Sequence, residues 1–98
     1  MKPESSILQL ELNTEMVHYD LGTAHVQLKE YQAAVSEFSK VLSINPKSTA
    51  AYNMLGNIYL NNLNKPDVAL QYFGNSLRVN PEQPRASELR ELIRKSGS

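Results

Sequence analysis

The chain has 98 residues, enough for one small domain, with 41% hydrophobic residues, 20% charged residues and a formal net charge of zero. This balance gives no electrostatic attraction toward nucleic acid or an acidic membrane surface. Cysteine is absent, which excludes disulfides, thiolate catalysis and cysteine-based zinc sites. No signal core and no apolar run of the roughly 20 residues needed to cross a bilayer is visible, so a cytoplasmic location is favoured.

Apolar spacing predicts five helices, at about 15–28, 31–43, 49–62, 66–78 and 84–95. In the first, a stripe at spacings of three and four is expected to face the core, and it consists of Val17, Leu21, Ala24 and Leu28. Asn13 or Thr14 is the expected N-cap of this helix. The last helix carries a narrow apolar stripe between charged residues, made of Ala86, Leu89, Leu92 and Ile93, which is typical of a solvating cap.

Prolines and cap residues separate the predicted helices. Pro46 and Pro81 cannot continue the helices before them, and Pro66 and Pro84 suit a first helical turn. Ser48 or Thr49 is the expected N-cap of the third helix. The linkers are only a few residues long, so successive helices are expected to pack as antiparallel neighbours.

One pattern occurs twice, with the second copy 34 residues after the first. The first copy is His18-x-x-Leu21-Gly22-x-x-His25, and the second is Tyr52-x-x-Leu55-Gly56-x-x-Tyr59. The copies then continue with Ala34, Phe38 and Asn45-Pro46, and with Ala69, Phe73 and Asn80-Pro81, now offset by 35. A repeat of this length and order resembles the tetratricopeptide repeat.

The resemblance implies an all-α fold of antiparallel helical hairpins stacked as a short α-solenoid. Two repeats are expected at 15–48 and 49–83, followed by a cap helix at 84–95 and a flexible tail at 96–98. The flank at 1–14 is interpreted as a remnant of a preceding repeat. Gly22 and Gly56 mark close helix crossings, because glycine in a helix costs about 1 kcal/mol relative to alanine. Ala34 and Ala69 are expected to be their small partners, while the phenylalanines fill the space between repeats.

No catalytic, metal or cofactor site is predicted. His18 and His25 are seven residues apart, which separates them by about 10 Å along a helix. Both occupy positions where the family places core aromatics, so a packing role is favoured over metal binding. The serines lack a nucleophile-elbow context and the glycines are isolated, which argues against an enzyme.

The resemblance implies protein–protein interaction, with a peptide or partner helix held in the concave groove lined by the first helix of each repeat. The residues expected to face it are Met16, Tyr19, Asp20, Thr23 and Gln27, then Asn53, Met54, Asn57 and Asn61, with Arg85 and Glu88 extending it. The three asparagines are spaced by four and form a row of amides, which both donate and accept hydrogen bonds. The alternative is that these asparagines are merely solvated.

A second interpretation is a structural module that self-assembles by edge stacking of repeats. The N-terminal flank carries four large apolar residues within six positions, namely Ile7, Leu8, Leu10 and Leu12. A solvated tail is usually polar. This segment is therefore expected to fold back on the first helix around Val17 and Leu21 or to reach a neighbouring copy, which predicts a weak homodimer.

Overall fold

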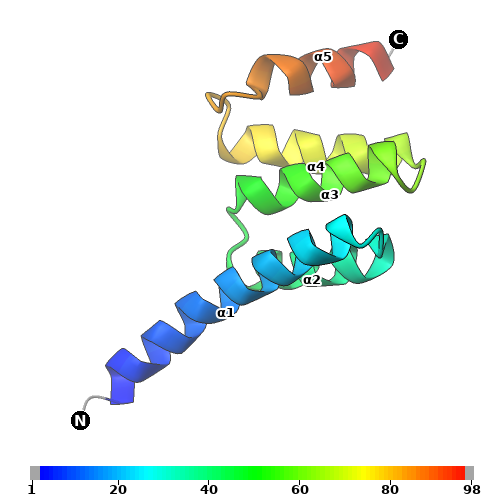
Figure 1. Ribbon diagram of the computed structural model, residues 1–98. Coiled ribbons are helices and arrows are strands. Elements are labelled where there is room, and N and C mark those ends of the chain that lie inside the picture. The colour runs from blue at the N-terminus through cyan, green and yellow to red at the C-terminus, as the bar shows by residue number, and fades with distance from the viewer. Residues whose placement is uncertain (1–2, 97–98) are drawn as a thin grey trace. The chain divides into compact units, whose positions relative to one another are not determined.

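The computed structural model describes the backbone of residues 3–96 and the side chains of residues 14–96. Five α-helices and no strand occupy the described part: α1 (Pro3–Gln27), α2 (Tyr31–Ile44), α3 (Thr49–Asn61), α4 (Pro66–Val79) and α5 (Ala86–Ser96) (Figure 1). They fall into two compact units, Met1–Pro46 with α1 and α2 and Lys47–Ser98 with α3, α4 and α5. In each unit, consecutive helices pack against each other. The predicted all-α class is therefore confirmed.

α1 begins 12 residues before the predicted start at residue 15. Asn13 and Thr14 lie inside it, so neither is an N-cap, and the prediction of a cap there was wrong. The preceding segment contains leucines, glutamates and a glutamine, which favour helix strongly enough to carry the helix through one asparagine and one threonine. Pro3 is accommodated because it occupies the first turn.

A continuous α1 also excludes the predicted fold-back of the N-terminal flank. The helix contains no turn that would return residues 5–12 to Val17 and Leu21. α1 has 25 residues and α2 has 14, so α1 extends beyond its partner at the N-terminal end (Figure 1). The side chains of the predicted self-association edge, Ile7, Leu8, Leu10 and Leu12, lie outside the described residues.

Each of the two hairpin turns contains one residue in the left-handed region. Lys29, between α1 and α2, has a φ of 64°, and Asn64, between α3 and α4, has a φ of 55°. These left-handed residues allow the next amides to reach back, with Glu30 N–H donating to His25 O at 2.8 Å and Lys65 N–H to Tyr59 O at 2.8 Å. Both helix ends are closed in this way without a glycine.

Phenylalanine rings lie directly over the two helical glycines. A Cβ added to Gly22 would meet Phe38 Cζ at 2.7 Å, and one added to Gly56 would meet Phe73 Cδ1 at 2.7 Å. The nearest atoms to each glycine therefore belong to the phenylalanine of the same hairpin, and not to the alanine that was expected there. Both phenylalanines are fully buried.

The N-cap of α3 and the buried side of α5 follow the sequence, but α5 begins at Ala86, so the prediction that Pro84 lies in its first turn was wrong. Of the two candidate caps of α3, Ser48 is the one used, because its Oγ accepts the Ala51 N–H at 3.1 Å. α5 packs against α4, where fully buried Leu89 joins Phe73 in one core cluster. Its partly buried Leu92 and Ile93 border the same cluster, so the predicted apolar stripe is confirmed.

The predicted core stripe of α1 is not in the core. Val17 is 51% exposed, Leu21 43% and Leu28 67%. Ala24 is exposed as well. α2 packs against the opposite side of α1, where Gly22 allows Phe38 to approach. The helical period was correct, but the face that it assigned to the core was wrong.

Candidate functional site

In the second unit, the first asparagine of the predicted row is bonded inside the protein. Asn53 Nδ2 donates to Gln83 Oε1 at 2.8 Å. The Asn53 Oδ1 atom is buried, and no described residue donates to it. Asn53 therefore ties α3 to the segment between α4 and α5, and it is poorly placed to offer its amide to a ligand.

Gln83 fixes this segment through several hydrogen bonds. Its Nε2 donates to Ser76 Oγ at 2.9 Å and to Asn80 O at 3.0 Å. Gln83 is 7% exposed and Ser76 is fully buried. Burial of polar groups is tolerated because they are bonded to each other. Gln83 and Ser76 were missed by sequence reasoning, because a glutamine in a polar loop and a serine in a helix give no distinctive local signal.

The second asparagine takes part in a partly exposed polar chain. Arg85 Nη2 donates to Asn57 Oδ1 at 3.2 Å and to Glu88 Oε2 at 3.0 Å, and Arg85 Nε donates to Glu88 Oε1 at 3.1 Å. The guanidinium also lies 5.7 Å from the centre of the Phe73 ring. The Arg85 hydrogen bond lowers the pKa of Glu88, although partial burial opposes the shift.

The remaining predicted residues of α3 are more accessible. Asn61 is exposed and Met54 is half-buried. Thus the predicted row divides into an internal bond at Asn53, a shared contact at Asn57 and an exposed amide at Asn61. Neither a free ladder nor simple solvation describes all three side chains.

In the first unit, some of the residues predicted to line the groove pack within the hairpin, and others are exposed. Tyr19 is half-buried, with its ring edge-on to Phe38 at a centroid distance of 5.4 Å. Thr23 Oγ1 donates to Tyr19 O at 3.1 Å. Asp20 and Gln27 are exposed, and Met16 is 62% exposed. Tyr19 therefore packs within the hairpin, while the exposed residues remain available for contacts.

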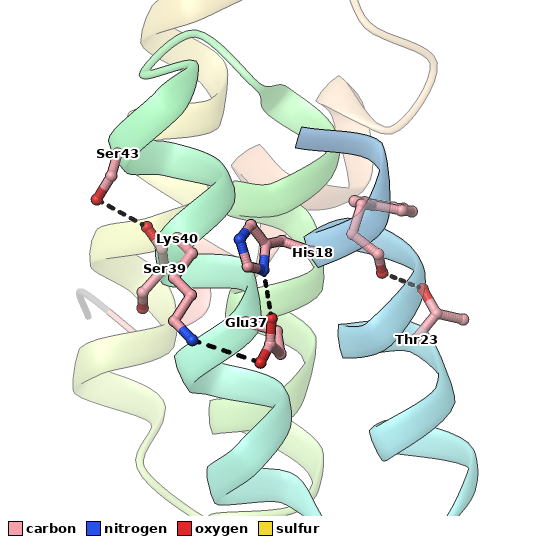
Figure 2. A network of polar contacts seen from close by, with 7 residues as sticks. His18, Thr23, Glu37, Ser39, Lys40 and Ser43 are labelled. Carbon is pink, nitrogen blue, oxygen red and sulfur yellow. Dashed lines mark hydrogen bonds and ion pairs between the residues drawn. The ribbon is translucent and has the colours of Figure 1, made fainter. Parts of the chain in front are cut away.

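Both histidines of α1 contact carboxylates, and each contacts a different one. His18 Nδ1 lies 2.6 Å from Glu37 Oε1, and Lys40 Nζ lies 3.6 Å from Glu37 Oε2 (Figure 2). The His18 hydrogen bond lowers the pKa of Glu37 more than burial raises it, and Lys40 adds to the lowering. His25 Nδ1 lies 2.7 Å from Glu30 Oε1. His18 thus links α1 to α2. Within the described residues, no cluster of three or more His, Cys, Asp or Glu side chains could hold a metal ion.

These hairpins carry the residues by which tetratricopeptide repeats are recognised. One tetratricopeptide repeat model matches residues 16–48 and another matches residues 37–71. Together the matches span residues 16–71, more than half of the chain. The chain belongs to the tetratricopeptide repeat family. A comparison with curated proteins gave no match.

Membership of this family carries a general function. Tetratricopeptide repeats generally mediate protein–protein interaction, and the family is generally a non-enzymatic scaffold. Among the described helices, none combines the length and the apolar character needed to span a membrane.

Proposed function

We propose that this tetratricopeptide repeat protein binds a peptide or a helix of another protein on the face of α3 that its hairpin partner α4 leaves accessible. The observation that carries the proposal is the polar chain Asn57–Arg85–Glu88 beside α3. It presents donors and acceptors at a partly exposed surface, with the Arg85 side chain 31% and the Glu88 side chain 59% exposed.

The hydrogen-bonding groups of Asn57, Arg85 and Glu88 favour a particular kind of ligand. Arg85 is already paired with Glu88, so a terminal carboxylate would have to displace an internal one. The amide N–H groups of Asn57 and Asn61 suit backbone carbonyls, and half-buried Met54 supplies an adaptable apolar contact. The proposed ligand is therefore an internal peptide segment rather than a free C-terminus.

The first unit carries a set of accessible polar groups of its own. Asp20 and Gln27 are exposed on α1, and Thr23 lies between them in sequence. Tyr19 is assigned to the hairpin core, and Asn53 to the internal bond with Gln83, so neither belongs to the proposed contact surface.

The test is selection of binders to the 98-residue chain from a displayed peptide library, followed by fluorescence anisotropy with the selected peptide. The double variant Asn57→Ala, Asn61→Ala should weaken binding roughly 5- to 150-fold, since each lost hydrogen bond contributes about 0.5–1.5 kcal/mol. The matched control Gln32→Ala, Gln71→Ala removes two exposed amides from α2 and α4 and should leave the affinity unchanged. Equal affinity for the parent and the asparagine variant would refute the assignment of this face.

A further inference from the structure

The side of α1 that faces away from α2 is an exposed apolar surface. Six large hydrophobic side chains are exposed among the described residues, and four of them belong to α1 or directly follow it. These four are Met16 at 62%, Val17 at 51%, Leu21 at 43% and Leu28 at 67%. The other two, Ile44 and Val79, lie at the ends of different helices. The apolar exposure is therefore concentrated on α1.

The spacing on this face is that of a helix that packs along a second helix. Val17, Leu21, Ala24 and Leu28, here called the α1 seam, are separated by four, three and four residues. Leu28 still belongs to the helical register, because its N–H donates to Ala24 O at 3.0 Å. Alternation of three and four is the heptad pattern by which two helices pack side by side.

The same spacing continues toward the N-terminus in the sequence. Thr14, Leu10 and Ile7 precede Val17 at intervals of three, four and three. Because α1 is continuous from Pro3, these positions fall on the same line along the helix as the seam. The pattern therefore covers about three heptads, with one threonine as its only polar position.

The charges beside the seam favour a second copy of this chain as its occupant. On the accessible flank lie Met16, Asp20, Thr23 and Gln27, of which only Asp20 is charged. On the other flank, Glu15 accepts a hydrogen bond from Asn45, and His18 and His25 are engaged by carboxylates of their own unit. Two identical α1 helices would therefore approach each other with little repulsion between like charges.

α5 argues against head-to-tail assembly. Its apolar side is used against α4, and its accessible residues are mostly charged: Glu88, Arg90, Glu91, Arg94 and Lys95. Pairing the apolar α1 seam with this surface would take these charged groups, including the Arg94–Glu91 ion pair, out of water without adding any hydrogen bond to them. An isologous contact, in which the same surface is used by both copies, closes at two chains and leaves no seam free.

We propose that two copies of this chain pair through their α1 seams to form a symmetric dimer. A helix of α1's length is about 37 Å long and about 10 Å wide, so the contact buries on the order of 700 Å² over both copies. This area is below the roughly 1,200–2,000 Å² of stable interfaces. The dimer is therefore weak, with a dissociation constant in the micromolar range or above. The pairing does not depend on the proposed peptide binding.

Sedimentation velocity from roughly 5 to 500 µM tests the proposal. The parent chain should shift from monomer to dimer across the series. The variant Val17→Gln, Leu21→Gln should remain monomeric with an unchanged helical circular dichroism signal, because both side chains are already exposed. The matched control Ile44→Gln, Val79→Gln removes the other two exposed apolar residues and should dimerise like the parent.

Cysteine cross-linking provides an independent measurement, because the parent chain contains no cysteine. Ala24→Cys places one thiol on the seam, and Ser87→Cys places one on exposed α5. Under mild oxidation at high concentration, the Ala24→Cys chain should form a disulfide-linked dimer much faster than the Ser87→Cys chain.

Three results would overturn the proposal. They are a parent that stays monomeric throughout the concentration series, a dimer that survives the seam substitutions, and equal cross-linking rates at the two cysteines. If the seam variant fails to fold, the cross-linking comparison decides the question by itself. A monomeric parent whose seam binds another protein's helix would also refute the second copy as its occupant.

Discussion

Replacing Gly56 with alanine should have two opposing effects on the stability of the fold, a cost from overpacking and a gain in helix propensity. The new Cβ would lie 2.7 Å from Phe73 Cδ1, whereas ordinary van der Waals contacts begin at 3.4 Å. Phe73 is fully buried in a cluster with Ala69 and Leu89, so the ring cannot retreat without moving a neighbour. Overpacking of this kind costs about 1–3 kcal/mol, while alanine gains about 1 kcal/mol over glycine in a helix. The net effect is a loss of roughly 0–2 kcal/mol.

Gly74 in α4 provides the matched control. It is also a helical glycine, but an added Cβ would meet no atom within 4 Å. Gly74→Ala should therefore gain about 1 kcal/mol, which raises Tm by about 4–8 °C in a domain of this size. Thermal melts followed by circular dichroism should show Gly56→Ala unchanged or lower in Tm and Gly74→Ala higher.

A double-mutant cycle with Phe73→Leu identifies the clash itself. If the ring causes the cost, Gly56→Ala should be stabilising in the Phe73→Leu background, because the shorter side chain leaves room for the new methyl group. The reasoning would be refuted if Gly56→Ala and Gly74→Ala raised Tm equally in the parent. The same holds if the Gly56→Ala effect did not change in the Phe73→Leu background.

Three further predictions concern other packed or bonded positions. Ala69→Leu should lower Tm sharply or unfold the second unit, because Ala69 is fully buried beside Phe73 and overpacking costs about 1–3 kcal/mol or more. Gln83→Ala should cost about 1–3 kcal/mol in chemical denaturation by leaving buried partners unbonded, whereas exposed Glu82→Ala should have little effect. The lowered pKa of Glu37 means that its ionised form stabilises the fold above about pH 4 and that this contribution is lost as the pH falls through the lower folded-state pKa. Melts at pH 7 and pH 3 should therefore show the parent more stable than Glu37→Gln at pH 7 and the difference reduced at pH 3.

The sequence by itself determined the features of this protein that depend on neighbouring residues. The helical period, the proline positions and the two Leu-Gly patterns are local, so they predicted an all-α repeat protein and the family to which the chain belongs. The apolar stripe of α5 was also correct, because its charged neighbours leave only one side that can pack.

The tertiary structure decided which side of α1 is covered. A helical period shows that a stripe exists, but it does not say which helix packs against it. Phe38 approaches at Gly22, so α2 lies on that side, and Val17 and Leu21 remain exposed. The true start at Pro3 was missed because asparagine and threonine favour N-caps and are also tolerated inside a helix.

The polar partners of α3 could be found only from the folded chain. Asn53 is bonded to Gln83, 30 residues away, and Asn57 to Arg85, 28 residues away. No local spacing rule connects residues so far apart in sequence. The α4–α5 segment decides which amides are bonded internally and which remain accessible, since hydrogen bonds depend on atomic positions that only the packed helices define.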